Sequence, residues 1–253
     1  MLKTLDQSLA VLNKFTREHP SWGVRELASE MEMSHSIVYR ILATYHKHGF
    51  LEQDKETRKY GLGLRFIEFG AMAGDRLGLA ERIRPIMKRL SEATGESVFL
   101  TWLDGREGVC LDIYESSQLL KYALAVGSRT PLYAGASNKI IMAYLTQGEQ
   151  ERIIAEGLKA GKPPKSFPGK DKLLAGLQNI RQEGWAYSLG DYSDSVFGIA
   201  VPLFNRNSEV TASLTVAGPE YRMPQENVAH TLQLLRSARD EVQQVLQHLL
   251  FFA

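Results

Sequence analysis

The segment between Glu32 and Glu52 contains no acidic residue, although the whole chain carries 29. It holds Arg40, Lys47 and three histidines instead. A surface that enters a DNA groove has to avoid carboxylates, because they repel phosphate, whereas arginine binds phosphate or guanine and hydroxyl groups bind either. This composition predicts a nucleic-acid interface. Its expected contacts are Ser34, His35, Ser36, Tyr39, Arg40, Thr44 and Lys47, with Arg58 and Lys59 from a following hairpin.

Three helices and a hairpin are expected to position these residues. Leucines spaced by four and three predict the first helix, and Ser34 is expected to cap the third helix, which Gly49 ends. This order is typical of a winged helix-turn-helix, although a three-helix core whose solvated face binds protein or nothing stays an alternative. The predicted ranges are 4–17, 25–31 and 35–48 for helices and 50–53 and 59–62 for strands.

Other chemistry finds little support in the sequence. The single cysteine, Cys110, excludes an intrachain disulfide and a zinc site built from cysteines. The sequence has no glycine-rich phosphate loop, no G-x-G-x-x-G and no G-x-S-x-G, and its only histidines after His48 are His230 and His248 in the expected last helix. We therefore expect no enzyme, no metal and no cofactor. The acids expected to be merely solvated are Asp112, Glu115, Asp191 and Asp194.

Length and charge limit the organisation of the chain. Its 253 residues are 44% hydrophobic and have a net charge of +1, so the chain can bury a core and any DNA-binding surface must be local. It lacks a run of about 18 apolar residues, so no membrane span is expected and the expected location is the cytoplasm. We expect a DNA-binding domain over residues 1–63, a glycine-interrupted connector helix over 64–79 and a second domain over 80–253.

The second domain alternates between helical and extended patterns. Helices that flank one mostly antiparallel sheet give an α+β fold, and a segment over 127–137 leads into a helix in its middle. The predicted helices cover 80–94, 138–145, 148–157, 171–183 and 227–252, and the predicted strands cover 97–103, 109–114, 121–126, 185–188, 196–204 and 210–217.

Motifs along both domains resemble those of the IclR family of bacterial transcriptional regulators. In the first domain, residues 5–15 and 23–66 follow the family pattern of a leucine-rich helix, an E-L-A segment, a serine before the recognition helix, and Y-x-L-G after the wing. In the second domain, residues 126–133 (V-G-S-R-T-P-L-Y) resemble V-G-x-R-x-P-L-(H/Y). Further resemblances cover residues 136–139, where Asn138 replaces a glycine, and 180–186, 199–204 and 214–219.

The resemblance implies a GAF/PAS-like second domain that binds a small effector. Backbone amides at the start of the helix after residue 137 favour an anionic ligand, so we expect a small carboxylate metabolite with one negative charge. A turn with a capped helix, and no ligand, is the alternative for this loop. The effector-binding residues carried over by motif are Ala134, Gly135, Ala136, Asn138, Ser188, Leu189, Asp191, Gly198, Thr215 and Ala217.

The implied function is a ligand-responsive regulator, and more specifically a repressor, that binds a palindromic double-stranded DNA operator as a homodimer. Two half-sites need two recognition helices, and apolar Phe66, Ile67 and Phe69 on the connector, with the first helix, are the expected dimer contact. The family also forms dimers of dimers. Two other classes stay open: an enzyme with a winged-helix leader, such as a biotin protein ligase, and a protein-interaction sensor without DNA binding.

Overall fold

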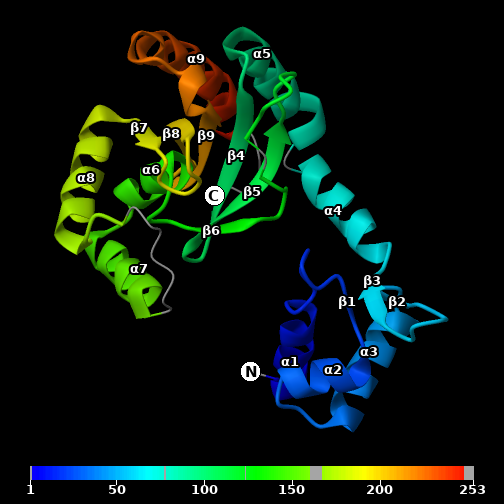
Figure 1. Ribbon diagram of the computed structural model, residues 1–253. Coiled ribbons are helices and arrows are strands. Elements are labelled where there is room, and N and C mark those ends of the chain that lie inside the picture. The colour runs from blue at the N-terminus through cyan, green and yellow to red at the C-terminus, as the bar shows by residue number, and fades with distance from the viewer. Residues whose placement is uncertain (1, 77, 123, 160–166, 248–253) are drawn as a thin grey trace. The chain divides into compact units, whose positions relative to one another are not determined.

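The computed structural model describes residues 2–76, 78–122, 124–159 and 167–247 (Figure 1). The chain divides between Asp75 and Arg76 into two compact units, which we describe separately. The division falls inside the connector helix, so this helix contributes residues to both units.

The N-terminal unit is a small helical domain with a three-stranded sheet of order β1-β3-β2. Its core includes Val11, Leu27, Val38, Leu42 and Leu51, each with 0% of its surface exposed. Its elements are α1 (Lys3–Leu12), β1 (Ser21–Trp22), α2 (Val24–Glu30), α3 (His35–Lys47), β2 (Leu51–Gln53), β3 (Tyr60–Leu62) and α4 (Arg65–Arg76).

Two local features of this unit differ from the sequence prediction. The first helix ends at Leu12 and not at residue 17, because Lys14 and Phe15 turn back to bond Val11 and Leu12, a tightening that ends a helix. The Lys14 carbonyl then accepts a 2.8 Å hydrogen bond from the indole of Trp22. That indole belongs to β1, a strand that the sequence analysis did not predict and that pairs with β3.

The C-terminal unit is built on a six-stranded antiparallel sheet of order β6-β5-β4-β9-β8-β7. Helices α5 and α9 cover one face, and α6, α7 and α8 lie on the other (Figure 1). The elements after a π-helical turn (Leu79–Ile83) are α5 (Arg84–Thr94), β4 (Ser97–Asp104), β5 (Glu107–Tyr114), β6 (Arg129–Pro131), α6 (Ala136–Tyr144), α7 (Gln147–Lys159), α8 (Lys170–Glu183), β7 (Ala186–Leu189), β8 (Val196–Phe204), β9 (Val210–Pro219), a 3₁₀ turn (Glu220–Arg222) and α9 (Gln225–Gln247).

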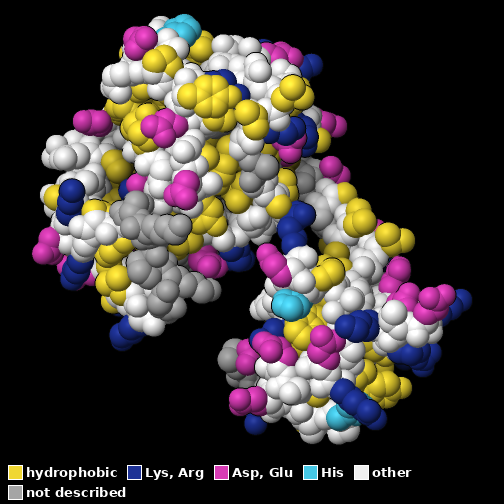
Figure 2. Space-filling view, viewed as in Figure 1, with side chains coloured by type: hydrophobic (Ala, Val, Ile, Leu, Met, Phe, Trp, Pro, Cys, Tyr) yellow, Lys and Arg dark blue, Asp and Glu magenta, His cyan; other side chains and the backbone are white. Residues whose placement is uncertain are grey.

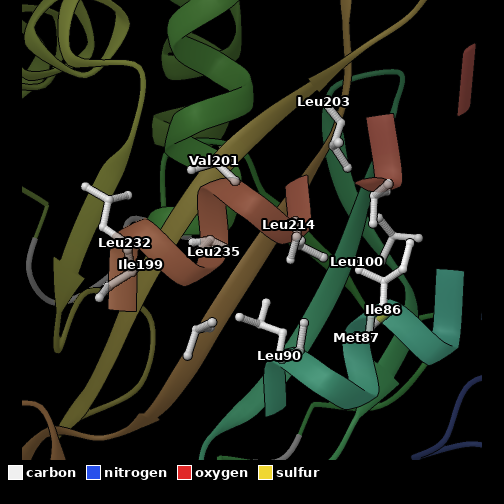
Figure 3. Packing of buried hydrophobic residues seen from close by; sticks show 14 of the residues in the cluster. Ile86, Met87, Leu90, Leu100, Ile199, Val201, Leu203, Leu214, Leu232 and Leu235 are labelled. Atoms are coloured by element: carbon white, nitrogen blue, oxygen red, sulfur yellow. The ribbon is translucent and has the colours of Figure 1, made fainter. Parts of the chain in front are cut away.

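The main core lies between the sheet and the pair α5 and α9. Figure 3 shows α5 contributing Ile86, Met87 and Leu90, which meet Leu100 of β4 and Leu214 of β9. Alternating strand residues point to this face, so the remaining residues of the same strands are free to line the other. The predicted α+β class, with helices around a mostly antiparallel sheet, is confirmed.

One predicted strand and one predicted helix start in this unit are wrong. The described residues of 121–126 do not form a strand, because a turn at Gly127 (φ +84°) lets only Arg129–Pro131 join the edge of the sheet. Tyr122 and Leu124 pack on the face of the sheet against Phe99 and Cys110 instead. The helix expected from residue 138 begins at Ala136, and the last helix is described to Gln247, so residues 248–252 of that prediction lie outside the described chain.

No helix among the described residues has both the length and the apolar character that crossing a membrane requires.

Candidate functional site

Helix α3 presents a polar face opposite its buried one. Val38, Ile41 and Leu42 point into the core, and the positions between them face solvent. The Thr44 hydroxyl donates a 2.7 Å hydrogen bond to the Arg40 carbonyl. The hydroxyl oxygen of Thr44 therefore remains free to accept a hydrogen bond. All six side chains that the sequence predicted as DNA contacts within this helix are exposed: His35, Ser36, Tyr39, Arg40, Thr44 and Lys47.

Ser34 occupies the N-cap position of α3 but does not cap it with its side chain, contrary to the prediction. Its backbone is extended, and its hydroxyl oxygen lies 3.4 Å from that of Ser36. Both hydroxyls therefore stand at the positive end of the helix, where a DNA phosphate is favoured by the free amides and by the helix dipole.

The wing between β2 and β3 is a tight turn held by Asp54. Its carboxylate accepts hydrogen bonds from the Thr57 amide and hydroxyl at 2.6 and 2.7 Å, and these bonds lower the pKa of Asp54. Arg58 follows with a positive φ of 58° and an exposed side chain. Lys59 was expected to contact the DNA backbone, but its ammonium lies 3.1 Å from the Glu26 carboxylate of α2. Lys55, which the sequence analysis missed, is exposed in the turn. Its place in the polar turn between the two predicted strands was the available signal.

A cavity of about 60 Å³ lies in the C-terminal unit against the sheet face opposite α5 and α9. Nine of the ten residues predicted to bind the effector line it: Ala134, Gly135, Ala136, Asn138, Ser188, Asp191, Gly198, Thr215 and Ala217. Leu189 does not line the cavity, because strand neighbours alternate between faces and Ser188 takes the inward position. Leu189 is 44% exposed.

Other cavity residues were missed by the sequence analysis. Alternation along β4 places Phe99 and Thr101 on the same face, and this was the only signal available for them. Tyr122 and Leu124 reach the cavity because their segment packs over the sheet, and burial raises the pKa of Tyr122 to about 12. The remaining ones are Thr130, Ser137, Tyr192, Ser193 and Val196, together with Phe197, for which a place in the core was preferred.

Hydrogen bonds fix the start of α6 over the cavity. The Ala136 amide donates to the Ser188 hydroxyl at 2.9 Å. The Asn138 side chain donates to the Thr130 hydroxyl at 2.8 Å and to the Ala134 carbonyl at 3.0 Å. The amides of Ser137 and Asn138 are left without an intrahelical acceptor, since the first helix bond runs from Lys139 to Gly135.

Charges near the cavity are paired. Asp191 was expected to be solvated, but its side chain is 20% exposed and forms an ion pair with Lys139, whose side chain is 16% exposed. Asp112 was also expected to be solvated and is instead buried, with Arg84 at 3.0 Å. Arg129 bonds Asp104 and Glu107, so it braces the loop.

Two further residues have structural roles. Cys110 is buried, and burial raises the pKa of its thiol to about 12. Tyr133 packs against Phe167 in the helical core and does not line the cavity. No cluster of three or more potential metal ligands occurs within the part of the chain that the structure describes.

Comparison with known proteins covers both units. Residues 4–55 match the IclR helix-turn-helix domain, and residues 71–244 match the bacterial transcriptional regulator IclR C-terminal domain. The chain is 30% identical to the HTH-type transcriptional regulator KipR of Bacillus subtilis (strain 168) over 93% of this chain and 94% of KipR.

Solved structures agree with these matches. A crystal structure of an IclR transcriptional regulator from Silicibacter sp. TM1040 has a TM-score of 0.87 and 25% identity over 96% of each chain. An IclR homologue from Microbacterium hydrocarbonoxydans, crystallised with 4-hydroxybenzoate, has a TM-score of 0.79 and 22% identity over 96% of this chain and 98% of that one. The chain therefore belongs to the IclR family, and it is a DNA-binding transcriptional regulator and not an enzyme.

Proposed function

We propose that this regulator is a repressor whose affinity for its operator changes when a small organic acid binds in the cavity of the C-terminal unit. The observation that carries the proposal is the start of α6, where two residues whose amides have no intrahelical acceptor line a cavity on the sheet. Repression is proposed because a dimer seated on operator DNA excludes polymerase from the same stretch. A regulator of this kind acts in the cytoplasm, where the chromosome is.

The electrostatics of the cavity favour a ligand with one negative charge. Lys139 and Asp191 neutralise each other at its edge, so neither supplies a net charge. The preference for an anion then rests on the amides of Ser137 and Asn138 and on the helix dipole, which together attract a carboxylate. Because Lys139 is already paired with Asp191, it does not neutralise a second negative group on that side.

The size and lining of the cavity limit the rest of the ligand. Its 60 Å³ is well below the roughly 150 Å³ of a cavity that accepts benzene, so an acid of a few carbon atoms fits without rearrangement. Phe99, Tyr122 and Phe197 give one side of the cavity an apolar surface. The carboxylate in the 4-hydroxybenzoate complex of the IclR homologue supports the ligand class.

DNA binding is assigned to the exposed face of α3 and to the wing. The residues proposed to contact DNA are Ser34, His35, Ser36, Tyr39, Arg40, Thr44, Lys47, Lys55 and Arg58. Lys59 is assigned to holding the wing against α2 through Glu26, and not to phosphate. Figure 2 shows Lys and Arg side chains gathered around the wing.

A homodimer on a palindromic operator is proposed from the apolar side chains that α1 and α4 expose. Leu5, Leu9, Ile67 and Met72 are between 51% and 69% exposed, and Figure 2 shows hydrophobic side chains along α4. Phe66 and Phe69 were also expected at the interface, but both pack on Phe50 of their own unit, at 5.3 and 5.7 Å between ring centroids. They contribute to the fold of the unit, and Ile67 becomes the better probe of the dimer.

The experiment compares operator affinity with and without small carboxylates, using DNA that the protein selects from a random library. Ala217→Leu adds bulk to the cavity from the floor of the sheet and should abolish the carboxylate response while it leaves DNA binding intact. Gly135 is unsuitable for this purpose, because its φ of +76° would strain any larger residue. Ala175→Leu, on the exposed face of α8, is the matched control. An Ala217→Leu protein that still responds like the wild type would contradict the proposed pocket.

A further inference from the structure

Two buried polar atoms, on residues that line the cavity, have no hydrogen-bond partner among the described residues. They are the side-chain oxygen Oδ1 of Asn138 and the hydroxyl oxygen Oγ1 of Thr215. The residues are only 3% and 4% exposed, and both line the cavity. Buried polar groups in folded proteins are nearly always satisfied, so each of these atoms indicates a group that the protein is built to receive.

The orientation of the Asn138 carboxamide is fixed by its neighbours. Its nitrogen faces the Ala134 carbonyl at 3.0 Å, and a carbonyl can only accept, so the nitrogen cannot exchange places with the oxygen. The Oδ1 atom consequently lies over β5, where a Cβ atom on Gly108 would come within 1.9 Å of it. Glycine at position 108 therefore leaves the space that Oδ1 occupies.

No nearby hydroxyl supplies the missing donor. Thr130 accepts from the Asn138 side chain and directs its own hydrogen to the Gly108 carbonyl at 3.3 Å. Thr215 is held on β9, between Phe99 of β4 and Ala200 of β8 in register. Asn138 Oδ1 thus requires a hydrogen-bond donor, whereas the Thr215 hydroxyl can either donate or accept.

We infer that Asn138 and Thr215 select effectors that carry a hydroxyl group near the carboxylate, and so distinguish hydroxy acids from the corresponding keto and unsubstituted acids. This inference rests on the proposed function, because it takes the α6 amides as the carboxylate site. The Asn138 amide and Asn138 Oδ1 belong to one residue, so a ligand that bonds both carries its hydroxyl close to its carboxylate. A keto oxygen offers no donor and leaves Oδ1 unsatisfied.

The test uses the full-length protein and titration calorimetry with lactate, pyruvate and propionate, together with glycolate and acetate. These probes share one carboxylate and differ at one position. The hydroxy acids should bind about tenfold to a hundredfold tighter than their partners, which corresponds to the usual penalty for a buried acceptor left without a donor. Pyruvate that binds as tightly as both lactate enantiomers would overturn the inference and leave the proposed function standing.

Two variants test whether Thr215 and Asn138 create the preference for a hydroxyl group. Thr215→Val preserves the shape of the side chain and removes a hydroxyl that bonds nothing in the described fold, so its thermal stability should not fall. Asn138→Leu removes the acceptor, and circular dichroism checks that α6 survives the loss of its two donor bonds. Both variants should still bind propionate. Asn138→Leu should favour lactate over pyruvate by less than about threefold, and Thr215→Val should lose part of the preference for lactate over propionate. Thr231→Val, a buried threonine of α9 outside the cavity lining, is the control and should keep the full preference.

The outcomes separate the two claims. Carboxylates that bind without a hydroxyl preference contradict the inference alone. A full hydroxyl preference that persists in both Thr215→Val and Asn138→Leu shows that other residues create it, which also overturns the inference. If none of the probes binds at millimolar concentration, the carboxylate site itself is wrong, and the proposed function fails together with the inference.

Discussion

The two units present their functional residues in opposite ways. In the N-terminal unit, every proposed DNA contact is an exposed side chain on one helix and one turn, supported by a core behind it. In the C-terminal unit, the cavity lies against the sheet, and its lining comes from β4, β6, β7, β8, β9, the start of α6 and three loop segments. A residue on the exposed DNA-binding face can therefore be substituted without disturbing the others. A residue that lines the cavity is constrained by the neighbours packed against it.

Ion pairs show the same difference. Lys14 and Glu30 of the N-terminal unit pair at 2.8 Å, with side chains 36% and 50% exposed. In the C-terminal unit, Arg222 bonds both oxygens of Glu96 at 2.5 and 2.6 Å, and the Glu96 side chain is only 4% exposed. Solvent weakens the first pair, while the second holds a buried charge whose loss of partner is expensive.

The largest effect, a loss of operator affinity, is expected from breaking the proposed dimer. A double variant, Leu5→Glu with Ile67→Asp, should yield monomers, because it places charges among exposed apolar side chains of α1 and α4. Operator affinity should then fall by about 10²–10⁴-fold, since the two half-sites are no longer engaged together. Sedimentation measures the assembly and fluorescence anisotropy the affinity. Leu119→Glu, fully exposed in the C-terminal unit, is the control, and a dimeric double variant would refute the assignment.

Removing the buried cation should have the next largest effect. Arg222→Met leaves Glu96 without its bidentate partner and should lower the stability of the C-terminal unit by about 3–5 kcal/mol. The exposed counterpart, Glu30→Gln, should cost less than about 1 kcal/mol. Chemical denaturation followed by circular dichroism measures both. Equal losses in the two variants would show that the contrast in burial does not govern these pairs.

A smaller effect on DNA binding alone is expected from Arg40. Its exposed side chain on α3 makes no bond that α3 needs, so Arg40→Ala should weaken operator binding by about 1–3 kcal/mol if it contacts a guanine. Carboxylate binding should not change, because the cavity lies in the other unit. An anisotropy midpoint equal to that of the wild type would remove Arg40 from the interface.

The smallest effect expected is the reaction of the buried Cys110 thiol in the native protein. Burial raises the pKa of its thiol to about 12, so at pH 8 nearly all of it is protonated and unreactive. A thiol reagent such as DTNB should react with the native protein far more slowly than with the protein in guanidinium chloride. Rapid reaction of the native protein would mean that the sheet face beneath Tyr122 opens readily.

The contrast between the units also explains what the sequence could predict. The DNA-binding face of α3 could be predicted from helical periodicity and from the missing acids, because all its residues lie on one helix and their spacing determines which side they face. The pairing of Lys59 with Glu26 joins residues that are far apart in sequence, so local pattern could not predict it. Neither could the packing of Phe66 on Phe50.

The cavity was predicted only through family resemblance. Its lining depends on register between strands, such as Thr215 opposite Phe99, and register is not visible in one sequence. The prediction that Leu189 lines the cavity was wrong for the same reason, since a one-residue shift along a strand moves a side chain to the opposite face of the sheet. The segment before Gly127 was predicted as a strand, but Tyr122 and Leu124 pack on the sheet and do not extend it.

The central claim is that the cavity and the DNA-binding face are energetically coupled, and linkage tests it most directly. Any factor by which a carboxylate changes operator affinity must equal the factor by which operator changes carboxylate affinity. Titration calorimetry of lactate into the free protein and into the operator complex measures the second factor, and anisotropy measures the first. We expect matching factors of about fivefold to 150-fold in the wild type and no change in Ala217→Leu. Lactate that binds the free protein and the operator complex equally would contradict the claim.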